Sequence, residues 1–396
     1  MTCFTDIAAW RVNPGYEEST RTSITTGAMT FATPTGPTEM ATKTTAARTA
    51  TEPELLAAAQ RGETAAFEQL VAIYRRPLHA HCYRMLGSLQ DAEDALQETL
   101  LAAWRGLSGF EGRSSLRSWL YRVATNACLR LAERRPQRHL SSDRSPVWSD
   151  VHNIGDYTEE PLWLEPYPSD ASDPSGSDPA ANYQQRENVE LAFVAALQNL
   201  PANQRAVLIL REVLEFSAAE VAEALDTTVA SVNSALQRAR KAVDHRIVAG
   251  SQEAELRALG AEGQQGLVDA FVAAWARADV DGILDMLAED VRFAMPPFPA
   301  WFVGRTHVGQ FLSERTFARS WRLRPMVANG QLAFACYVNK PETAPDRFEL
   351  GVINVVTLRN GRVAEMNAFL DPEVHRWFGL PPELAGRGMR SSAGER

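Results

Sequence analysis

Two consecutive segments within residues 91–130 carry the side chains best suited to binding chemistry. In the first, Asp91, Asp94 and Glu98 recur at helical spacing, so their carboxylates share one side of a helix and can meet a basic protein. In the second, arginines stand beside aromatic rings, a combination that binds phosphates and stacks on splayed bases. The chain therefore indicates two partners, a basic protein and single-stranded DNA.

Both segments also carry apolar stripes that predict amphipathic helices. The stripe of the first helix is Leu89, Ala92, Leu96 and Ala103, and that of the second is Leu116, Leu120, Val123 and Ala127. Taken alone, a carboxylate stripe is usually a solvated face, and a single Trp or Tyr usually belongs to a core. The binding interpretation rests on the joint occurrence of both helices, the Gly/Phe loop between them and a second motif, in the expected order along the chain.

Three runs in this region resemble the second conserved region of extracytoplasmic-function sigma factors, namely GETAAFEQLVAIYRRPLHAHCYRML (62–86), DAEDALQET (91–99) and FEGRSSLRSWLYRVATN (110–126). The resemblance implies a subunit that binds core RNA polymerase and melts promoter DNA. It implies that the clamp of the beta-prime polymerase subunit contacts Asp94, Gln97 and Glu98. It also implies that the minus-ten element, with one base flipped out, contacts Phe110, Arg113, Arg117, Trp119, Tyr121 and Asn126.

A second motif lies farther along the chain. Ser217, with Glu220 three residues on, forms a capping box that opens a helix. A break at 226–228 and a second helix then give helix-turn-helix geometry. The inward face of that second helix is predicted to be Val229, Val232, Leu236, Ala239 and Val243.

With its lead-in LPANQRAVLILREVLEFS (200–217), this motif resembles the fourth conserved sigma region, which reads the minus-thirty-five element. The exposed face would contact DNA through Ser231, Asn233, Ser234, Gln237, Arg238 and Lys241. Asn and Gln suit adenine edges, whereas Arg and Lys suit phosphates. Cations are sparser here than in the common family pattern, so we expect weak DNA binding outside the polymerase complex.

The C-terminal part of the chain has a different pattern. A pattern that begins as helical over 267–297 is followed by segments that are rich in β-branched residues and alternate as strands do. The sequence RNGR at 359–362 predicts a tight hairpin. We expect an α+β cone with a curved antiparallel sheet, and 264–377 resembles SnoaL-like domains of the nuclear-transport-factor-2 superfamily. That fold holds a pocket in its family. The ionisable candidates for this pocket are Asp290, His307, Glu365 and Asp371, and they form no convincing catalytic constellation. The aromatic residues Trp301, Phe302 and Trp321 would line the pocket, form a contact with the helical modules, or belong to the core.

Composition divides the chain into six parts: a disordered extension (1–51), a helical domain (52–140), an acidic flexible linker with aromatic docking points (141–181), a helix-turn-helix domain (182–248), the cone (262–380) and a flexible tail (381–396). The net charge of -9 is uneven. Residues 55–140 hold 12 Arg against 8 Asp/Glu, whereas 141–187 hold 2 Arg against 10. A locally basic DNA-binding domain is therefore compatible with an acidic chain.

Some classes of site are not indicated. The four cysteines form no CxxC pair, so neither a disulfide framework nor a zinc site is expected. His79 and His81 near Cys82 resemble metal ligands, but residues two apart do not share a helix face. No run of about 18 apolar residues occurs, so no membrane span is expected. We expect a cytoplasmic protein with no metal and no cofactor.

The fold class expected is thus multidomain, with two all-α modules and a C-terminal α+β cone. The function expected is an alternative sigma factor without an active site, whose cone is regulatory. Its partners would be core RNA polymerase and promoter DNA, with an anti-sigma factor or a small ligand of the cone left open. Two alternatives remain, a SnoaL-type enzyme and an operator-binding regulator, and the acidic helix counts against both because neither needs it.

Overall fold

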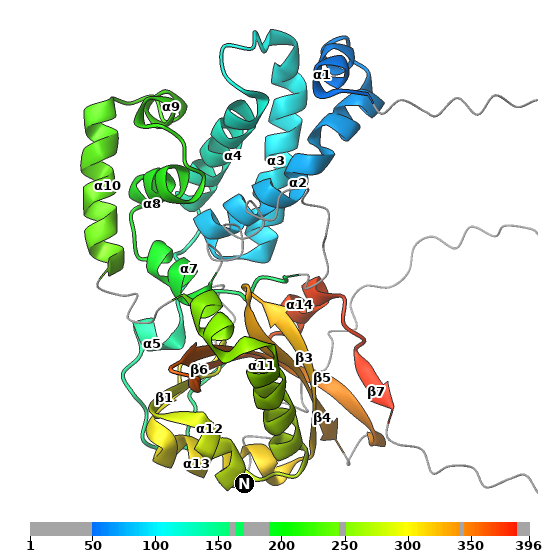
Figure 1. Ribbon diagram of the computed structural model, residues 1–396, viewed down its shortest axis with the longest axis vertical. Helices are drawn as coiled ribbons and strands as arrows, with labels where there is room; N and C mark the ends of the chain where they lie inside the picture. Colours follow the sequence, from blue (N-terminus) through cyan, green and yellow to red (C-terminus); the bar gives the residue numbers. More distant parts are fainter. Residues whose placement is uncertain (1–49, 158–162, 170–189, 245–250, 341–343, 386–396) are drawn as a thin grey trace, which may run out of the picture.

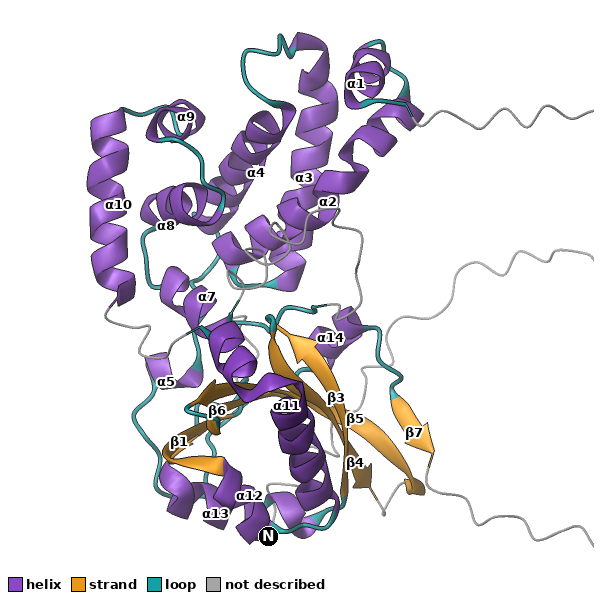
Figure 2. Cartoon of the chain, viewed as in Figure 1, coloured by secondary structure: helices purple, strands orange, loops and turns teal. Residues whose placement is uncertain are grey.

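The computed structural model describes residues 50–157, 163–169, 190–244, 251–340 and 344–385 (Figure 1). The predicted N-terminal extension lies almost wholly outside these residues, and so does the predicted tail from residue 386 onward. The tail's first residues, 381–385, are described and include a strand (Glu383–Ala385) that pairs with another strand, so the prediction of flexibility is wrong there. Two groups of helices stand above a cone of strands and helices (Figure 2). The two all-α modules and the α+β cone expected from the sequence are confirmed, and none of the helices in the described ranges is long and apolar enough to cross a membrane.

The first helical module consists of α1 (Glu52–Gln60), α2 (Thr64–Leu86), α3 (Leu89–Gly106), the short turn η1 (Leu107–Gly109) and α4 (Leu116–Ala132). Local signals set the ends of these helices. Gly87 ends α2 with a φ of 72°, a left-handed conformation that costs glycine little. Ser88 then caps α3 by accepting from the Asp91 amide, and Ser115 caps α4 by accepting from the Ser118 amide. The helices therefore start and stop where their own sequence dictates.

The second helical module consists of α7 (Leu191–Gln198), α8 (Ala202–Leu208), the π-helical turn η2 (Ile209–Val213), α9 (Ala218–Ala224) and α10 (Val229–Asp244). The predicted capping box is present, because the Ser217 amide donates to Glu220 at 2.8 Å and the Glu220 amide donates to Ser217 at 3.2 Å. Asp226 turns the chain with a φ of 50°, which gives the predicted helix-turn-helix. Val229 is 44% exposed, so its predicted burial is wrong; it begins the helix, before the inward stripe.

The cone contains a seven-stranded sheet covered by helices. Its elements are α11 (Gln252–Ala276), α12 (Val280–Met286), β1 (Leu287–Ala294), β2 (Trp301–Val303), α13 (Gly304–Glu314), η3 (Thr316–Ala318), β3 (Trp321–Ala328), β4 (Gln331–Lys340), β5 (Ala344–Arg359), β6 (Arg362–Phe369), α14 (Pro372–His375), η4 (Arg376–Phe378) and β7 (Glu383–Ala385). The strand order is β2-β1-β6-β5-β4-β3, with β7 on β5.

The sheet is mixed, so the expectation of a purely antiparallel sheet is wrong at one pairing. β1 and β6 run parallel, whereas every other pair is antiparallel. A hairpin would force antiparallel pairing, but these two strands are separated by the rest of the sheet. The predicted hairpin at 359–362 is confirmed, with Asn360 and Gly361 at positive φ. A second Asn-Gly hairpin, Asn329–Gly330 between β3 and β4, has the same signature and was missed.

The two faces of β5 belong to different cores. Val352 and Val356 pack inside the cone, whereas Ile353 and Val355 pack in the cluster that contains both helical modules. Successive side chains of a strand point to opposite faces, so one strand joins both cores. The cone is therefore attached to the helices through the back of its sheet.

The first part of the predicted linker is built into the cone. It contains α5 (Ser141–Arg144), and the Trp148 amide donates to the Trp301 carbonyl at 3.0 Å. Val151 and Ile154 are buried in the cone core. Gly155 passes so close to Pro299 that a Cβ would lie 2.6 Å from its Cγ. The prediction of flexibility is wrong for 141–157, because these apolar groups find a surface that the sequence does not reveal.

The second described part of the linker, 163–169, joins the first helical module to the cone. The Tyr83 hydroxyl donates to the Glu165 carbonyl at 2.6 Å, which fixes this strand of chain to α2. The Tyr167 amide donates to the Asn329 side chain at 2.8 Å, and the Asn329 amide returns a bond to the Tyr167 carbonyl at 2.8 Å. The Asn329 side chain also donates to the Tyr83 hydroxyl at 3.1 Å. Here too the chain is packed rather than free.

Asp91 belongs to a buried ion cluster and not to the solvated side of α3, so its placement beside Asp94 and Glu98 is wrong. Its carboxylate lies 2.7 Å from Arg138, and both side chains are almost fully buried. Arg138 also lies 3.4 Å from Glu165. Burial raises the pKa of Glu165, and Arg138 opposes that rise. The cluster therefore ties α3 to the linker.

We predict that Asp91→Ala lowers the free energy of unfolding of the helical part by about 3–5 kcal/mol, because it leaves Arg138 buried without this counter-ion. Urea denaturation followed by circular dichroism would measure the change. Asp94→Ala, on the same helix with a half-buried side chain, serves as the control and should change it by less than about 0.5 kcal/mol. Equal losses from the two variants would contradict the assignment.

Candidate binding surfaces and pocket

The three predicted clamp contacts lie together on one stretch of α3. Gln97 and Glu98 are exposed and Asp94 is half-buried. Asp94 accepts from Gln90 at 2.9 Å, and Glu98 pairs with Arg130 of α4 at 2.6 Å. Such solvated pairs contribute about 0–1 kcal/mol, so a basic partner can displace them. The structure thus offers a carboxylate-rich patch that is available for contact.

The loop before α4 presents rings and a cation. Phe110 and Trp119 are half-buried, and their ring centroids lie 5.3 Å apart. The Arg113 side chain is 85% exposed and lies 3.2 Å from Glu111. Asn126, farther along α4, is half-buried. These four residues keep accessible surface, as an interface with unpaired bases requires.

Tyr121, predicted to contact the minus-ten element, is 3% exposed. Its ring packs edge-on against His81 of α2, at 5.3 Å between centroids, and against Phe216, at 5.8 Å. Burial raises the pKa of Tyr121 and lowers that of His81 to about 3, so both are neutral at neutral pH. In this structure Tyr121 is a core residue, because its position on α4 faces α2 and the second module.

Arg117 makes one of the contacts between the two helical modules. Its guanidinium carbon lies 4.8 Å from the Phe216 ring centroid, and its Nη2 donates to the Leu214 carbonyl at 3.2 Å. Nearby, Ser118 donates to Glu220 at 3.3 Å, and Arg122 lies 3.6 Å from Glu223. The second module therefore covers part of the predicted DNA surface, at Arg117 and Tyr121, and leaves the other four predicted residues accessible. No local pattern could indicate this contact, since it joins residues about 100 positions apart.

The six predicted minus-thirty-five contacts all lie exposed on α10: Ser231, Asn233, Ser234, Gln237, Arg238 and Lys241. The opposite side of the helix, with Val232, Leu236, Ala239 and Val243, is buried. Amides and cations therefore share a face that is free to enter a groove. The exposed Arg240, which pairs with Glu212, adds a cation that the sequence reading did not include.

The ionisable candidates of the cone lie outside its pocket. Asp290 pairs with Arg359 at the surface, and Glu365 lies 3.5 Å from Arg292. His307 shares a hydrogen bond with the Val303 carbonyl, and Asp371 caps α14 by accepting from the Glu373 amide. Each has a structural role that its residue type alone does not reveal. The pocket hypothesis for these four residues is wrong.

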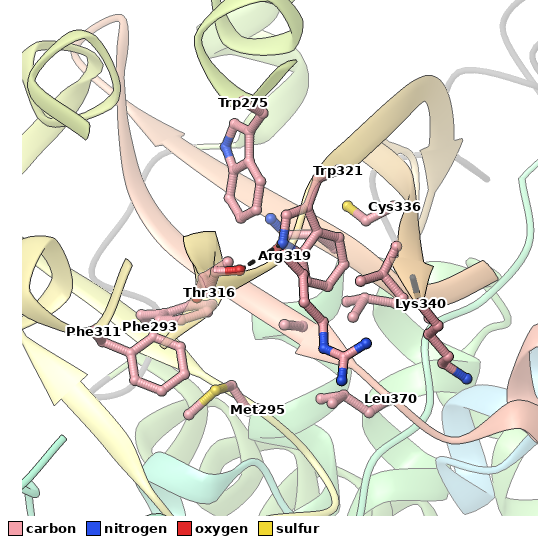
Figure 3. Close-up of a pocket in the computed structure, with 15 residues that line it drawn as sticks. Trp275, Phe293, Met295, Phe311, Thr316, Arg319, Trp321, Cys336, Lys340 and Leu370 are labelled. Carbon is pink, nitrogen blue, oxygen red and sulfur yellow. Dashed lines mark hydrogen bonds between the residues drawn. The ribbon is translucent and has the colours of Figure 1, made fainter. Parts of the chain in front are cut away.

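The pocket lies between the sheet and α11, α13 and η3 (Figure 3). Its empty space, which includes open solvent at the mouth, is about 780 Å³. Trp321 lines it, as the sequence allowed, whereas Trp301 donates to the Ser145 carbonyl of the linker and Phe302 is fully buried in the core. Asp, Glu and His are absent from its described lining. Burial raises the pKa of Cys336, so that lining thiol is neutral.

Within the described ranges, no group of three or more His, Cys, Asp or Glu could hold a metal ion. Cys82, Cys128 and Cys336 are buried free thiols.

Comparison with known proteins agrees with this architecture. Family models match at residues 70–138 (Sigma-70 region 2), 190–243 (Sigma-70, region 4) and 268–366 (SnoaL-like domain). The chain is 41% identical to the ECF RNA polymerase sigma factor SigG of Mycobacterium tuberculosis, over 78% of this chain and 83% of that protein. It is 28% identical to SigW of Bacillus subtilis, over 46% of this chain and 90% of that protein.

Among solved structures, the chain is similar to the extracytoplasmic function sigma factor SigJ of Mycobacterium tuberculosis. The TM-score is 0.52 at 22% sequence identity, and the match covers 79% of this chain and 99% of that one. This similarity supports the fold: two helical modules followed by a cone occur together in an experimentally solved protein.

We predict that Glu223→Arg loosens the contact between the helical modules, because it places a second cation beside Arg122. The readout is the thiol-labelling rate of a Ser118→Cys background, since Ser118 lies at that contact. Loss of an exposed pair and the new repulsion should raise the rate about twofold to fivefold. The charge swap Arg122→Glu with Glu223→Arg should restore the slower rate; if the single and swapped variants label equally fast, this pair does not hold the modules together.

Proposed function

This chain belongs to the extracytoplasmic-function RNA polymerase sigma factors, and from that premise we propose how its three parts divide the work. The first helical module binds core polymerase and the minus-ten element, and the second binds the minus-thirty-five element. The cone and the linker hold these modules in a closed resting arrangement. The observation that carries the last step is the direct contact of α4 with the α9 region through Arg117 and Ser118.

We assign the polymerase clamp contact to Asp94, Gln97 and Glu98. Support comes from their shared position on α3 and from the weak, solvated pairs they make in the free chain. A basic partner would replace those pairs at little cost. This surface does not suit DNA, because carboxylates repel phosphates.

We assign promoter recognition to two sets of side chains. Phe110, Arg113, Trp119 and Asn126 would receive the minus-ten element as the structure stands, and Arg117 would join them once it leaves Phe216. The exposed face of α10 would enter the major groove at the minus-thirty-five element, with Asn233 and Gln237 suited to adenine. Tyr121 is not assigned to promoter recognition as long as its side chain remains buried.

Geometry argues that the closed arrangement cannot read both elements at once. The elements are named for positions 25 base pairs apart, which is roughly 85 Å of duplex at about 3.4 Å per pair. α4 and α10 have 17 and 16 residues, so each is about 25 Å long. With α4 touching the α9 region at 3.3 Å, the two recognition surfaces lie too close together. The modules must separate before a promoter is bound.

We assign an inhibitory role, and not a catalytic one, to the cone and linker. The described lining of the pocket carries no carboxylate or imidazole for proton transfer, which disfavours a SnoaL-type enzyme. An operator-binding regulator is disfavoured because it would not need the carboxylate patch of α3. An anti-sigma factor is not required for a closed state, since the contacts that hold the modules together lie within this chain.

Asp94→Arg should abolish co-purification with core RNA polymerase while circular dichroism stays unchanged, because it reverses charge at a solvent-accessible position of the patch. Glu133→Arg, an exposed reversal that ends α4, is the matched control and should retain binding. Retained co-purification of Asp94→Arg would refute the clamp assignment.

In vitro transcription with core polymerase on fragments of the host genome would test the closed state. A chain ending at residue 250 should change promoter activity and keep the same start sites. Asn329→Gly removes the side-chain bonds to Tyr83 and Tyr167 but suits the positive φ at this position, so we expect about fivefold more transcript.

Asn360→Gly is the control, because it makes the same exchange at the matching turn between β5 and β6. Identical transcription from the full chain, the truncated chain and Asn329→Gly would refute the regulatory role of the cone. Transcripts that start at different sites after truncation would show instead that the cone takes part in promoter choice.

A further inference from the structure

Two pairs of aromatic rings line the cone pocket. Trp275 of α11 and Trp321 of β3 meet edge-on with 6.1 Å between ring centroids. Phe293 of β1 and Phe311 of α13 meet edge-on with 5.4 Å between theirs. Figure 3 shows the tryptophan pair on one side of the pocket and the phenylalanine pair on another. Because aromatic groups attract one another in stacked and edge-on arrangements, these walls favour a guest that contains an aromatic ring.

A buried side-chain carbonyl of this pocket lacks a hydrogen-bond partner. Asn354 lies on the same side of β5 as Val352 and Val356, whose side chains pack inside the cone. It lines the pocket and is 2% exposed, and its Oδ1 accepts no hydrogen bond. A buried acceptor without a donor destabilises a fold, so its presence in a pocket wall needs a reason. A guest that carries a hydroxyl group would supply the missing donor.

The ionisable groups of the lining do not call for a charged guest. Lys340 is paired with Glu349, with 2.5 Å between Nζ and Oε2, and Arg319 also interacts within the chain. Burial raises the pKa of the Cys336 thiol, so this group is neutral. An anion placed among the aromatic rings would lose its hydration without gaining a free counter-ion. The pocket therefore favours a neutral guest.

We propose that the cone binds a neutral phenol, with its ring among the two aromatic pairs and its hydroxyl donating to Asn354 Oδ1. The site binds the phenol and does not transform it, because the described lining offers no carboxylate or imidazole for proton transfer. Ile353 and Val355, the neighbours of Asn354, pack on the other face of β5 in the cluster that contains the helical modules. The inference rests on the proposed regulatory function for the purpose of binding, but not for its test.

The test is isothermal titration calorimetry of the full chain, without polymerase, using 4-ethylphenol as the probe. The comparison compound 1-ethyl-4-fluorobenzene has nearly the same shape, but its fluorine cannot donate a hydrogen bond. We expect the phenol to bind about threefold to tenfold more tightly, which is the contribution of one neutral hydrogen bond. The anion 4-ethylbenzoate should bind more weakly than the phenol. No saturable binding of the phenol, equal affinity for the fluoro compound, or tighter binding of the benzoate would overturn the proposal.

Variants test the role of Asn354. Asn354→Leu should abolish the preference for the phenol over the fluoro compound, because leucine has a similar size and no acceptor. Asn367→Leu is the matched control and should keep the preference, since Asn367 is a buried asparagine of β6 outside the described lining. Asn354→Val repeats the measurement if the leucine variant does not fold. An unchanged preference in the Asn354 variant would overturn the assignment.

Thermal unfolding of the free chain gives a second measurement. Asn354→Leu should raise the midpoint by a few degrees, because it removes a buried polar group that has no partner. A lowered midpoint would show that the amide serves the fold and would overturn its assignment to a guest. Both measurements are made without polymerase or DNA, so their failure is distinguishable from a failure of the transcription experiments.

Discussion

The arrangement of the whole chain depends on the hydrogen-bonded junction of Tyr83, Tyr167 and Asn329. Tyr83 comes from α2, Tyr167 from the linker and Asn329 from the β3–β4 hairpin, and their mutual bonds are buried. Because buried polar groups are costly when unpaired, the Asn329 side chain requires both tyrosines, one for its oxygen and one for its nitrogen. The junction fixes the described part of the linker, 163–169, between the helices and the cone.

The approximate free energies of these contacts indicate which of them breaks most easily. The back of the sheet buries Ile353, Val355 and Phe369 against the helices, and each such side chain contributes about 1.5–3 kcal/mol. The polar pairs between α4 and the α9 region are partly solvated and contribute about 0–1 kcal/mol each. The contact of α4 with the α9 region is therefore the weaker part of the interface between the modules, because α7 and α2 are also joined by a buried hydrogen bond from Gln198 to the Arg84 carbonyl at 3.0 Å. Since β5 alternates between the pocket and this apolar interface, one strand both lines the pocket and holds the helices.

Much of the fold was predictable because its signals are local. Capping at Ser217, the break at Asp226 and the Asn-Gly hairpin at Asn360 are set by residues within a few positions of one another. The exposed face of α10 followed from helical periodicity alone. The burial of Asp91 and Tyr121 did not follow from helical periodicity, because each residue faces a partner far along the chain, Arg138 in one case and Phe216 in the other. The parallel β1–β6 pair was missed for the same reason.

The sequence by itself determined the two helical modules, the cone and the residue types that suit polymerase, DNA bases and phosphates, because periodicity, caps and turns are encoded in neighbouring residues. Only the tertiary structure decided that the linker is packed, that the second module lies on α4, and that the pocket is lined by Arg319 and Asn354 instead of the ionisable residues first considered. These features are contacts between distant segments, and their free energies depend on burial and distance, which no local pattern contains.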